Sequence, residues 1–254
     1  MTAVALCTGA GSGIGRATAV ALAARGAIVV VSDVDSEGGE ETLALVEAAG
    51  AEGAFVPANI ADAEQVGSLV VHVVERFGRL DCAANVAGTH AGLGALTADC
   101  TEEDFDVQLR VNLRGTWLCV RAELKQMLAQ GSGSIVNVSS VNGLTGAAQA
   151  VGYSVAKHGI LGLTRTAAVE YADRGIRVNA VCPGLVDTPL TTRALEIGGA
   201  DPAEALASIL GEIPAGRMAT AEEIGECVAW LCLDASPYLN GATITVDGGL
   251  TVRG

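Results

Sequence analysis

Short apolar runs alternate with helical patterns along almost the whole chain, and this alternation constrains its fold more than any other feature. Seven runs have the length and residue types of buried strands: 3–8, 27–32, 53–57, 80–85, 134–139, 176–182 and 242–246. Helix formers fill the segments near 14–25, 36–49, 62–77, 102–130, 153–173 and 221–233. Strands joined by helical crossovers run parallel and are covered on both faces. The sequence therefore predicts an α/β fold, a three-layer αβα sandwich around a seven-stranded parallel sheet.

No feature of the composition marks a domain boundary, since the chain has no Pro-rich or Gly/Ser-rich linker and no short-period repeat. We therefore expect residues 1–254 to form one catalytic domain. The least regular segment is 185–216, where Gly198, Gly199 and prolines interrupt a helical pattern after the sixth strand. We expect this segment to be a mobile lid over the substrate, with an ordinary surface excursion as the alternative.

Charge and hydropathy exclude several kinds of partner. Half of the residues are hydrophobic and 17% are charged, so the chain can bury a large core. Its net charge of −14 argues against binding DNA, RNA or an anionic membrane, because these partners select basic surfaces. A nucleotide cofactor is still compatible, because backbone amides at a helix N-terminus hold phosphate without net positive charge.

The cysteines and histidines form no pattern typical of a disulfide framework or a metal site. The seven cysteines are scattered without a Cys-x-x-Cys pair, and His72, His90 and His158 lack ligand spacing. The first residues contain neither a basic leader nor a long apolar span. We therefore expect a soluble cytoplasmic protein with reduced thiols and no bound metal.

A glycine-rich turn, Thr8-Gly9-Ala10-Gly11-Ser12-Gly13-Ile14-Gly15, joins the first strand to the first helix. Glycines bring the backbone close to a ligand, and the positive end of the following helix faces that ligand. The spacing differs from the common Gly-x-Gly-x-x-Gly. Its place between strand and helix nevertheless favours a Rossmann-type site for the pyrophosphate of a dinucleotide.

Asp33 ends the second strand, at the offset expected for the acid that binds the adenosine ribose. Its carboxylate can accept both ribose hydroxyls but would repel a 2′-phosphate. No Lys or Arg stands at Ser12 or Val34 to compensate. Asp33 therefore favours NAD over NADP, and a solvated turn at the strand end is its alternative role.

Tyr153 and Lys157 open a helical segment four residues apart, a spacing that places both side chains on one helix face. A neighbouring ammonium favours the phenolate, so we expect Lys157 to lower the pKa of Tyr153. The phenol could then exchange protons as a general acid and base near neutral pH. A surface contact between the two side chains is the alternative.

With these motifs in order, the chain resembles the classical short-chain dehydrogenase/reductase family from about Val4 to Gly249. The family's glycine motif matches Thr8, Gly9, Gly13 and Gly15, and its Tyr-x-x-x-Lys matches Tyr153 and Lys157. The family's serine lies thirteen positions before the tyrosine, which is Ser140 at the end of the fifth strand. The resemblance also implies Asn112 as a fourth catalytic member, which holds a water through a local helix distortion.

The resemblance implies a set of cofactor contacts around this catalytic group. Pro183, Gly184, Val186 and Thr188 look like the family's nicotinamide contact. The full set of implied cofactor residues is Gly9, Ser12, Gly13, Ile14, Gly15, Asp33, Asn59, Ile60, Asn85, Ala87, Gly88, Tyr153, Lys157, Pro183, Gly184, Val186 and Thr188. Two positions depart from the family pattern: Val86 replaces an asparagine, and Asn59 replaces the usual aspartate at the adenine.

The expected activity is NAD-dependent hydride transfer between a secondary alcohol, cyclic alcohol or diol and the corresponding ketone. Tyr153 is the expected acid and base, Ser140 steadies the substrate oxygen, and Lys157 holds the ribose. The apolar lid segment favours a small neutral or alicyclic substrate. Reduction of a 3-oxoacyl thioester by the same family is one alternative, and a non-catalytic dinucleotide-binding redox sensor is another.

The resemblance further implies a homotetramer that pairs the helices near 102–130 and 153–173 and the last helix and strand. Trp230 belongs either to that last contact or to the core. His90 follows the fourth strand, where loops line the cleft, and is a candidate substrate contact. A surface or packing role is the commoner state of a lone histidine.

Overall fold

A single parallel sheet forms the centre of the computed structural model, which describes residues 2–197 and 202–252. Its strand order is β3-β2-β1-β4-β5-β6-β7, and every neighbouring pair is parallel. The strands are β1 (Val4–Thr8), β2 (Ile28–Ser32), β3 (Gly53–Phe55), β4 (Cys82–Asn85), β5 (Gly133–Val138), β6 (Ile176–Pro183) and β7 (Thr243–Val246). The predicted α/β class and all seven strands are confirmed.

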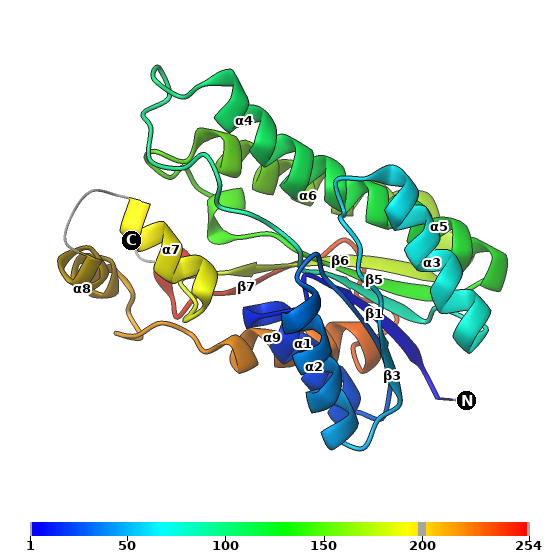
Figure 1. Cartoon of the computed structure of the whole chain (residues 1–254). Helices are drawn as coiled ribbons and strands as arrows, with labels where there is room; N and C mark the ends of the chain where they lie inside the picture. The colour runs from blue at the N-terminus through cyan, green and yellow to red at the C-terminus, as the bar shows by residue number, and fades with distance from the viewer. Residues whose placement is uncertain (1, 198–201, 253–254) are drawn as a thin grey trace.

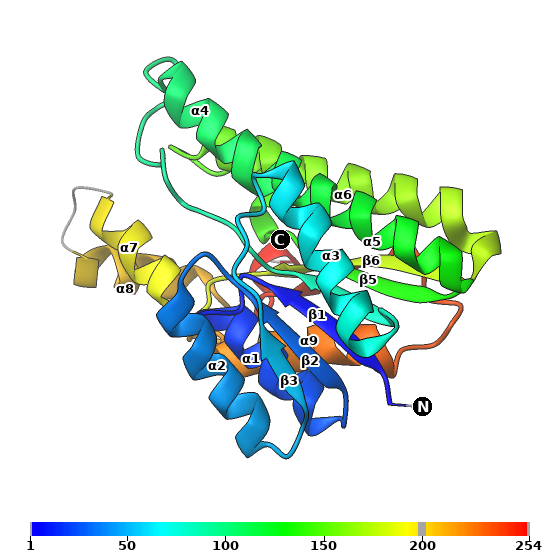
Figure 2. The same cartoon turned by 45° about the vertical axis from the view of Figure 1, so that its right-hand side comes forward.

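Helices cover both faces of the sheet, as Figures 1 and 2 show from two directions. One face carries α1 (Gly13–Ala24), α2 (Ser36–Ala48) and α9 (Ala221–Leu233). The other carries α3 (Ala63–Phe77), α5 (Thr116–Gln130) and α6 (Val151–Tyr171). Two separate aliphatic clusters fill the two interfaces between these layers. Because helices bury the sheet on both faces, its strands are apolar along almost their whole length.

The strand order reverses between the neighbouring strands β1 and β4, because the connection from β3 to β4 carries the chain back past β1. Strands β2 and β3 lie on one side of β1, and β4 to β7 lie on the other. In open α/β sheets, ligands bind at the carboxyl ends of the strands where the order reverses. The topology therefore directs the search for a site to the loops after β1 and β4.

The helical segment predicted at 102–130 is interrupted. It consists of α4 (Glu102–Gln108), a π-helical stretch η1 (Leu109–Gly115) and α5. Gly115 lies against Ile60, where a Cβ atom would approach the isoleucine side chain to 2.8 Å. The wide turn is centred on Asn112, so the helix distortion that the family resemblance implied is present.

Two further helices, α7 (Pro189–Ile197) and α8 (Pro202–Glu212), lie beyond the carboxyl end of the sheet in the segment expected as a lid. Gly198 and Gly199 lie outside the described residues. Trp230, on α9, is 41% exposed, so its side chain is not an ordinary core residue. Across the described ranges, no helix combines the length and hydropathy that crossing a membrane requires.

Short 3-10 turns complete the chain. They are η2 (Val141–Gly143) after β5, η3 (Ala172–Arg174) after α6 and η4 (Leu250–Val252) near the C-terminus. The first of these begins directly at Ser140, whose hydroxyl accepts a hydrogen bond from the Asn142 amide at 3.1 Å. The backbone therefore turns directly after β5 and keeps Ser140 at the carboxyl end of the sheet.

Candidate active site

A cleft of about 600 Å³ opens at the carboxyl ends of the strands. It brings together residues from the glycine-rich turn, the ends of β2, β4, β5 and β6, the start of α6 and the first turn of α7. The predicted site residues that line it are Gly9, Ser12, Gly13, Ile14, Gly15, Asp33, Asn59, Ile60, Ala87, Gly88, Ser140, Tyr153, Lys157, Pro183, Gly184, Val186 and Thr188. Asn85 and Asn112 are not among its lining residues.

The glycine-rich turn passes so close to the loop after β4 that side chains would not fit. Gly9 has a φ of +68°, and a Cβ there would lie 2.5 Å from the Ala87 Cα. A Cβ on Gly15 would collide with the Gly9 carbonyl oxygen. These contacts hold the start of α1 against the end of the sheet.

The N-terminus of α1 is open toward the cleft. Ser12 is its N-cap residue, but the Ser12 side chain makes no capping hydrogen bond, and the first turn contains no acidic residue. First-turn amides without internal partners attract an anion. The cradle therefore fits the pyrophosphate of a dinucleotide.

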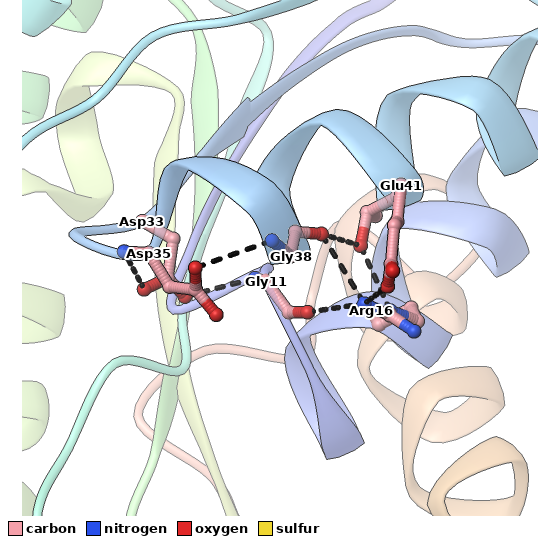
Figure 3. A network of polar contacts seen from close by, with 7 residues as sticks. Gly11, Arg16, Asp33, Asp35, Gly38 and Glu41 are labelled. Carbon is pink, nitrogen blue, oxygen red and sulfur yellow. Dashed lines mark hydrogen bonds and ion pairs between the residues drawn. The ribbon is translucent and has the colours of Figure 1, made fainter.

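Asp33 is fixed at the end of β2 by two backbone amides (Figure 3). Its Oδ2 accepts a hydrogen bond from Gly11 at 2.8 Å, and its Oδ1 accepts one from Asp35 at 3.0 Å. The carboxylate lines the cleft close to the turn that would hold the phosphates. Its position therefore suits the ribose contact that the sequence predicts.

Arg16 lies beside the same turn, and its guanidinium forms hydrogen bonds and an ion pair within the protein (Figure 3). Its Nη2 donates to the Gly11 carbonyl at 2.6 Å and forms an ion pair with Glu41 at 2.8 Å. Its Nε donates to the Thr42 hydroxyl at 3.0 Å. Arg16 therefore braces α1 against α2 and is not one of the cleft-lining residues.

Ser140, Tyr153 and Lys157 meet at the other end of the cleft. The Lys157 Nζ lies 5.5 Å from the centre of the Tyr153 ring and donates a hydrogen bond to the Val138 carbonyl at 2.9 Å. Tyr153 and Lys157 are 9% and 4% exposed. The helix face that the spacing predicted is therefore buried against the end of β5, and a surface contact is ruled out.

The pKa of Tyr153 differs from the sequence-based expectation. Burial raises it to about 12, while interaction with the Ser140 side chain acts in the opposite direction. Burial also lowers the pKa of Lys157 to about 8. The expectation of a lowered Tyr153 pKa was wrong, because the loss of hydration on burial raises the pKa more than the hydrogen bond with Ser140 lowers it.

Asn112 holds the loop after β4 in place. Its Oδ1 accepts from the Thr89 amide at 2.8 Å, and its Nδ2 donates to the Thr89 carbonyl at 3.0 Å. Nδ2 also donates to Gln108, whose own amide donates to the Ala91 carbonyl. Asn112 is fully buried, so it is not a helix-surface amide.

Sequence reasoning missed the supporting role of Gln108. Its position, one helical turn before Asn112, was the available signal, because side chains four residues apart share a helix face. Gln108 is fully buried, like Asn112. The two amides together tie the π-helical stretch to residues 89–91.

Two predicted cofactor residues use their side chains elsewhere. Asn85 is buried, and its Nδ2 donates to Glu123 at 3.0 Å and to Asn137 at 3.1 Å. Its amide therefore joins β4 to β5 and α5 within the core. The Oδ1 of Asn59, at the cleft edge, accepts from the Ala61 amide at 3.0 Å and stabilises a local turn.

Comparisons with known proteins identify the family. A family model described as enoyl-(acyl carrier protein) reductase matches residues 9–251. The short chain dehydrogenase/reductase astE of Aspergillus oryzae is 44% identical over 252 residues, which cover 98% of this chain and 95% of that protein. The chain belongs to the short-chain dehydrogenase/reductase family. It is therefore an oxidoreductase, and its relatives differ in substrate.

Two other dehydrogenase/reductase relatives illustrate this range. The cis-4-hydroxycyclohexanecarboxylate dehydrogenase of Sinomonas cyclohexanicum is 43% identical and covers 98% of this chain and 96% of its own length. The 3-oxoacyl-(acyl-carrier-protein) reductase FabG of Thermotoga maritima is 39% identical and covers 98% of both. Both names describe oxidoreductases that act on alcohols or ketones.

Solved structures of dehydrogenase/reductase relatives share the whole fold. Levodione reductase superposes with a TM-score of 0.96 at 41% identity, covering 98% of both chains. An actinorhodin polyketide ketoreductase with NADPH gives 0.92 at 36% identity, covering 98% of this chain and 97% of that chain. A xylitol dehydrogenase with NAD⁺ gives 0.93 at 32% identity, covering 97% and 98%. Relatives of this fold thus bind either nicotinamide dinucleotide.

Proposed function

We propose that this protein is an NAD-dependent dehydrogenase/reductase that interconverts a secondary cyclic alcohol and its ketone. The observation that carries the proposal is one cleft that holds Ser140, Tyr153 and Lys157 at one end and Asp33 at the other. Hydride transfer with a nicotinamide dinucleotide requires both a group that acts on the substrate and an acid that binds the adenosine ribose. A redox sensor would have no use for the buried catalytic group.

The preference for NAD follows from the charges around Asp33. The carboxylate accepts from two backbone amides, and Arg16 is occupied behind the turn. Among the described residues that line the cleft, the Lys and Arg side chains are those of Lys157 and Arg193, on α6 and α7. A 2′-phosphate would therefore meet a negative charge without a cation beside it.

In the proposed mechanism, Tyr153 moves the proton at the substrate oxygen. For reduction, the phenol donates its proton to the ketone oxygen, and its raised pKa keeps it protonated beforehand. For oxidation, Tyr153 accepts the alcohol proton. A bound nicotinamide would supply the hydride acceptor or donor, and the positive charge of its oxidised form would favour the Tyr153 phenolate.

The remaining residues orient this step. Ser140 donates a hydrogen bond to the substrate oxygen, on which charge develops. Lys157, buried beside Tyr153, would hold the nicotinamide ribose of a bound cofactor and would pass the proton between Tyr153 and solvent. Asn112 and Gln108 keep the loop after β4 in register with the cleft. The glycine-rich turn, with Pro183, Gly184, Val186 and Thr188 opposite it, would hold the rest of the cofactor.

A cyclic substrate is favoured by the relatives that act on cyclic compounds, among them the hydroxycyclohexanecarboxylate dehydrogenase. A second candidate, reduction of a 3-oxoacyl thioester, is favoured by the similarity to the Thermotoga reductase over 98% of both chains. The two candidates differ in the size and charge of the substrate that has to enter the cleft.

We also propose one catalytic domain over residues 1–254, with 185–216 as the lid, in a cytoplasmic homotetramer. An exposed groove between η1, the start of α5 and α6 supports the oligomer: its apolar lining is Leu109, Leu113, Trp117 and Leu163, with Asp106, Arg110 and Arg114 beside them, and Trp117 is 41% exposed. Light scattering after size-exclusion chromatography measures the subunit number. A monomer at micromolar concentration would contradict this part of the proposal.

The experiment that tests the activity is the appearance of NADH or NADPH absorbance with purified protein. NAD and NADP are each combined with cyclohexanols, cyclohexanediols, 3-hydroxyacyl thioesters and linear secondary alcohols. We expect turnover of the cyclic alcohols with NAD. Turnover confined to the thioesters would favour the second candidate, and NADH binding without turnover of any alcohol would favour the redox sensor.

A further inference from the structure

His90 lies in the loop after β4 and lines the same cleft as Ser140, Tyr153 and Lys157. Its imidazole packs edge-on against the Tyr153 ring, with the ring centroids 4.8 Å apart and the planes at 81°. A side chain in contact with the proposed acid and base borders the space where a substrate carbinol has to lie. The geometry therefore places His90 beside the reacting end of the cleft.

The imidazole also contacts the first turn of α7. Its Nδ1 lies 3.3 Å from the carbonyl oxygen of Leu190, a residue 100 positions away in the sequence. A carbonyl oxygen only accepts hydrogen bonds, so this contact requires the hydrogen on Nδ1. The neutral ring then has its lone pair on Nε2, and no described residue makes a hydrogen bond with that atom.

The charge state of His90 is defined by its surroundings. Burial lowers its pKa to about 4, and the nearby Lys157 ammonium acts in the same direction. The ring is therefore neutral at physiological pH. With Nδ1 as the donor, the neutral imidazole has a hydrogen-bond acceptor at Nε2 and no positive charge, on a residue that lines the cleft.

We propose that His90 is a specificity-determining residue whose Nε2 accepts a hydrogen bond from a second hydroxyl of the substrate, on a carbon adjacent to the carbinol. This inference rests on the proposed function and narrows it to vicinal diols. The two rings touch, so only a short distance separates the carbinol oxygen near Tyr153 from a group at His90. A carbonyl or carboxylate in the same place would set an acceptor against the Nε2 lone pair.

The test compares cyclohexanol with cis- and trans-1,2-cyclohexanediol as substrates for NAD-dependent oxidation. The readout is the ratio of kcat/KM for the better diol to kcat/KM for cyclohexanol, which cancels general effects on Tyr153 or on the cofactor. Wild type is measured beside His90→Phe, which keeps an aromatic ring without Nε2, and His90→Gln, which restores a side-chain acceptor. His72→Phe, an exposed position on α3, is the matched control.

We expect wild type and His72→Phe to prefer the diol. In His90→Phe the diol-to-cyclohexanol ratio should fall by about tenfold to a hundredfold, the range for losing a substrate hydrogen bond in a closed site. His90→Gln should recover at least part of the ratio. Recovery distinguishes hydrogen bonding from ring packing alone.

Three results would overturn the inference. A wild-type enzyme that oxidises cyclohexanol without preferring either diol leaves the proposed function intact and removes the role of His90. Equal losses on both substrates in His90→Phe, with an unchanged ratio, would make His90 a packing residue for Tyr153. No turnover of any secondary alcohol, with NADH still bound, would contradict the proposed function and this inference together.

Discussion

The Gly11 amide donates a hydrogen bond to Oδ2 of Asp33 at 2.8 Å, which fixes the glycine-rich turn to the end of β2. The carboxylate is thus oriented by the same loop that would hold the cofactor phosphates. The other oxygen accepts from Asp35. A change at Asp33 therefore alters the charge at the proposed ribose site without needing any large movement of the chain.

Replacing Asp33 by Asn tests the cofactor preference. The amide oxygen can still accept from Gly11, but the negative charge that repels a 2′-phosphate is gone. We expect the ratio of kcat/KM with NAD to kcat/KM with NADP to fall about tenfold or more, on the order of 1.4 kcal/mol. Asp173→Asn, at an exposed position in η3, is the matched control. An unchanged ratio would show that Asp33 does not discriminate between the cofactors.

Replacing Gly15 by Ala tests the close approach at the turn. The added methyl group would collide with the Gly9 carbonyl, so the start of α1 has to shift. We expect the free energy of unfolding to fall by about 1–3 kcal/mol and NADH binding to weaken. Gly67→Ala, in α3, has open space around the new methyl group and should instead raise stability by about 0.5–1 kcal/mol.

Urea titration and NADH fluorescence measure these two effects. If Gly15→Ala were as stable as wild type and bound NADH equally well, the close contact between Gly15 and the Gly9 carbonyl would be contradicted. Loss of stability with normal NADH affinity would instead limit the role of Gly15 to packing.

Glu123 makes the stability of the fold depend on pH. The side chain is fully buried, its Oε2 accepts from Asn85 at 3.0 Å, and its Oε1 has no hydrogen-bond partner among the described residues. Burial raises its pKa from 4.5 to about 8. The folded protein thus binds this proton in a pH range where the unfolded chain has lost it, so its contribution to stability declines as pH rises from about 4.5 to about 8.

We expect Glu123→Gln to remove this decline, because the amide keeps the size of the side chain without a titrating proton. Between about pH 6 and about pH 7, wild type should lose about 1 kcal/mol of unfolding free energy relative to the variant. Urea titrations at both pH values measure the difference, with the exposed Glu75→Gln as control. Parallel pH profiles for wild type and Glu123→Gln would mean that Glu123 is ionised in the folded protein.

The strands and the cleft could be predicted because their signals are local. Each strand is an apolar run between helical patterns, and the glycine-rich turn, Asp33 and the Tyr153–Lys157 pair follow at fixed offsets. The family resemblance added Ser140 and Asn112. The order of the strands in the sheet is enough to bring the glycine-rich turn, Asp33, Ser140 and the Tyr153–Lys157 pair to one cleft.

Features that depend on distant contacts do not follow from local composition. The helix distortion at Leu109–Gly115 is expected only from the family resemblance, because the stretch has an ordinary helical composition, and the Asn112 bonds to Thr89 that accompany it span 23 positions. Asn85 belongs to a cofactor motif, yet its amide meets Glu123 in the core. The raised pKa of Tyr153 arises from burial of the phenol, and burial cannot be predicted from the four-residue spacing between Tyr153 and Lys157.

The measurement that tests the central claim most directly is NAD-dependent oxidation of a cyclic alcohol by wild type and Tyr153→Phe, together with NADH binding to both. Phenylalanine keeps the ring but has no proton to exchange, and Ser140 and Lys157 stay in place. We expect NADH affinity within about threefold of wild type, since the phenol contributes at most one hydrogen bond to binding. We also expect kcat to fall by about a hundredfold or more, as for the loss of a general acid and base. Substantial turnover by Tyr153→Phe would contradict the account, because another group would then have to move the proton.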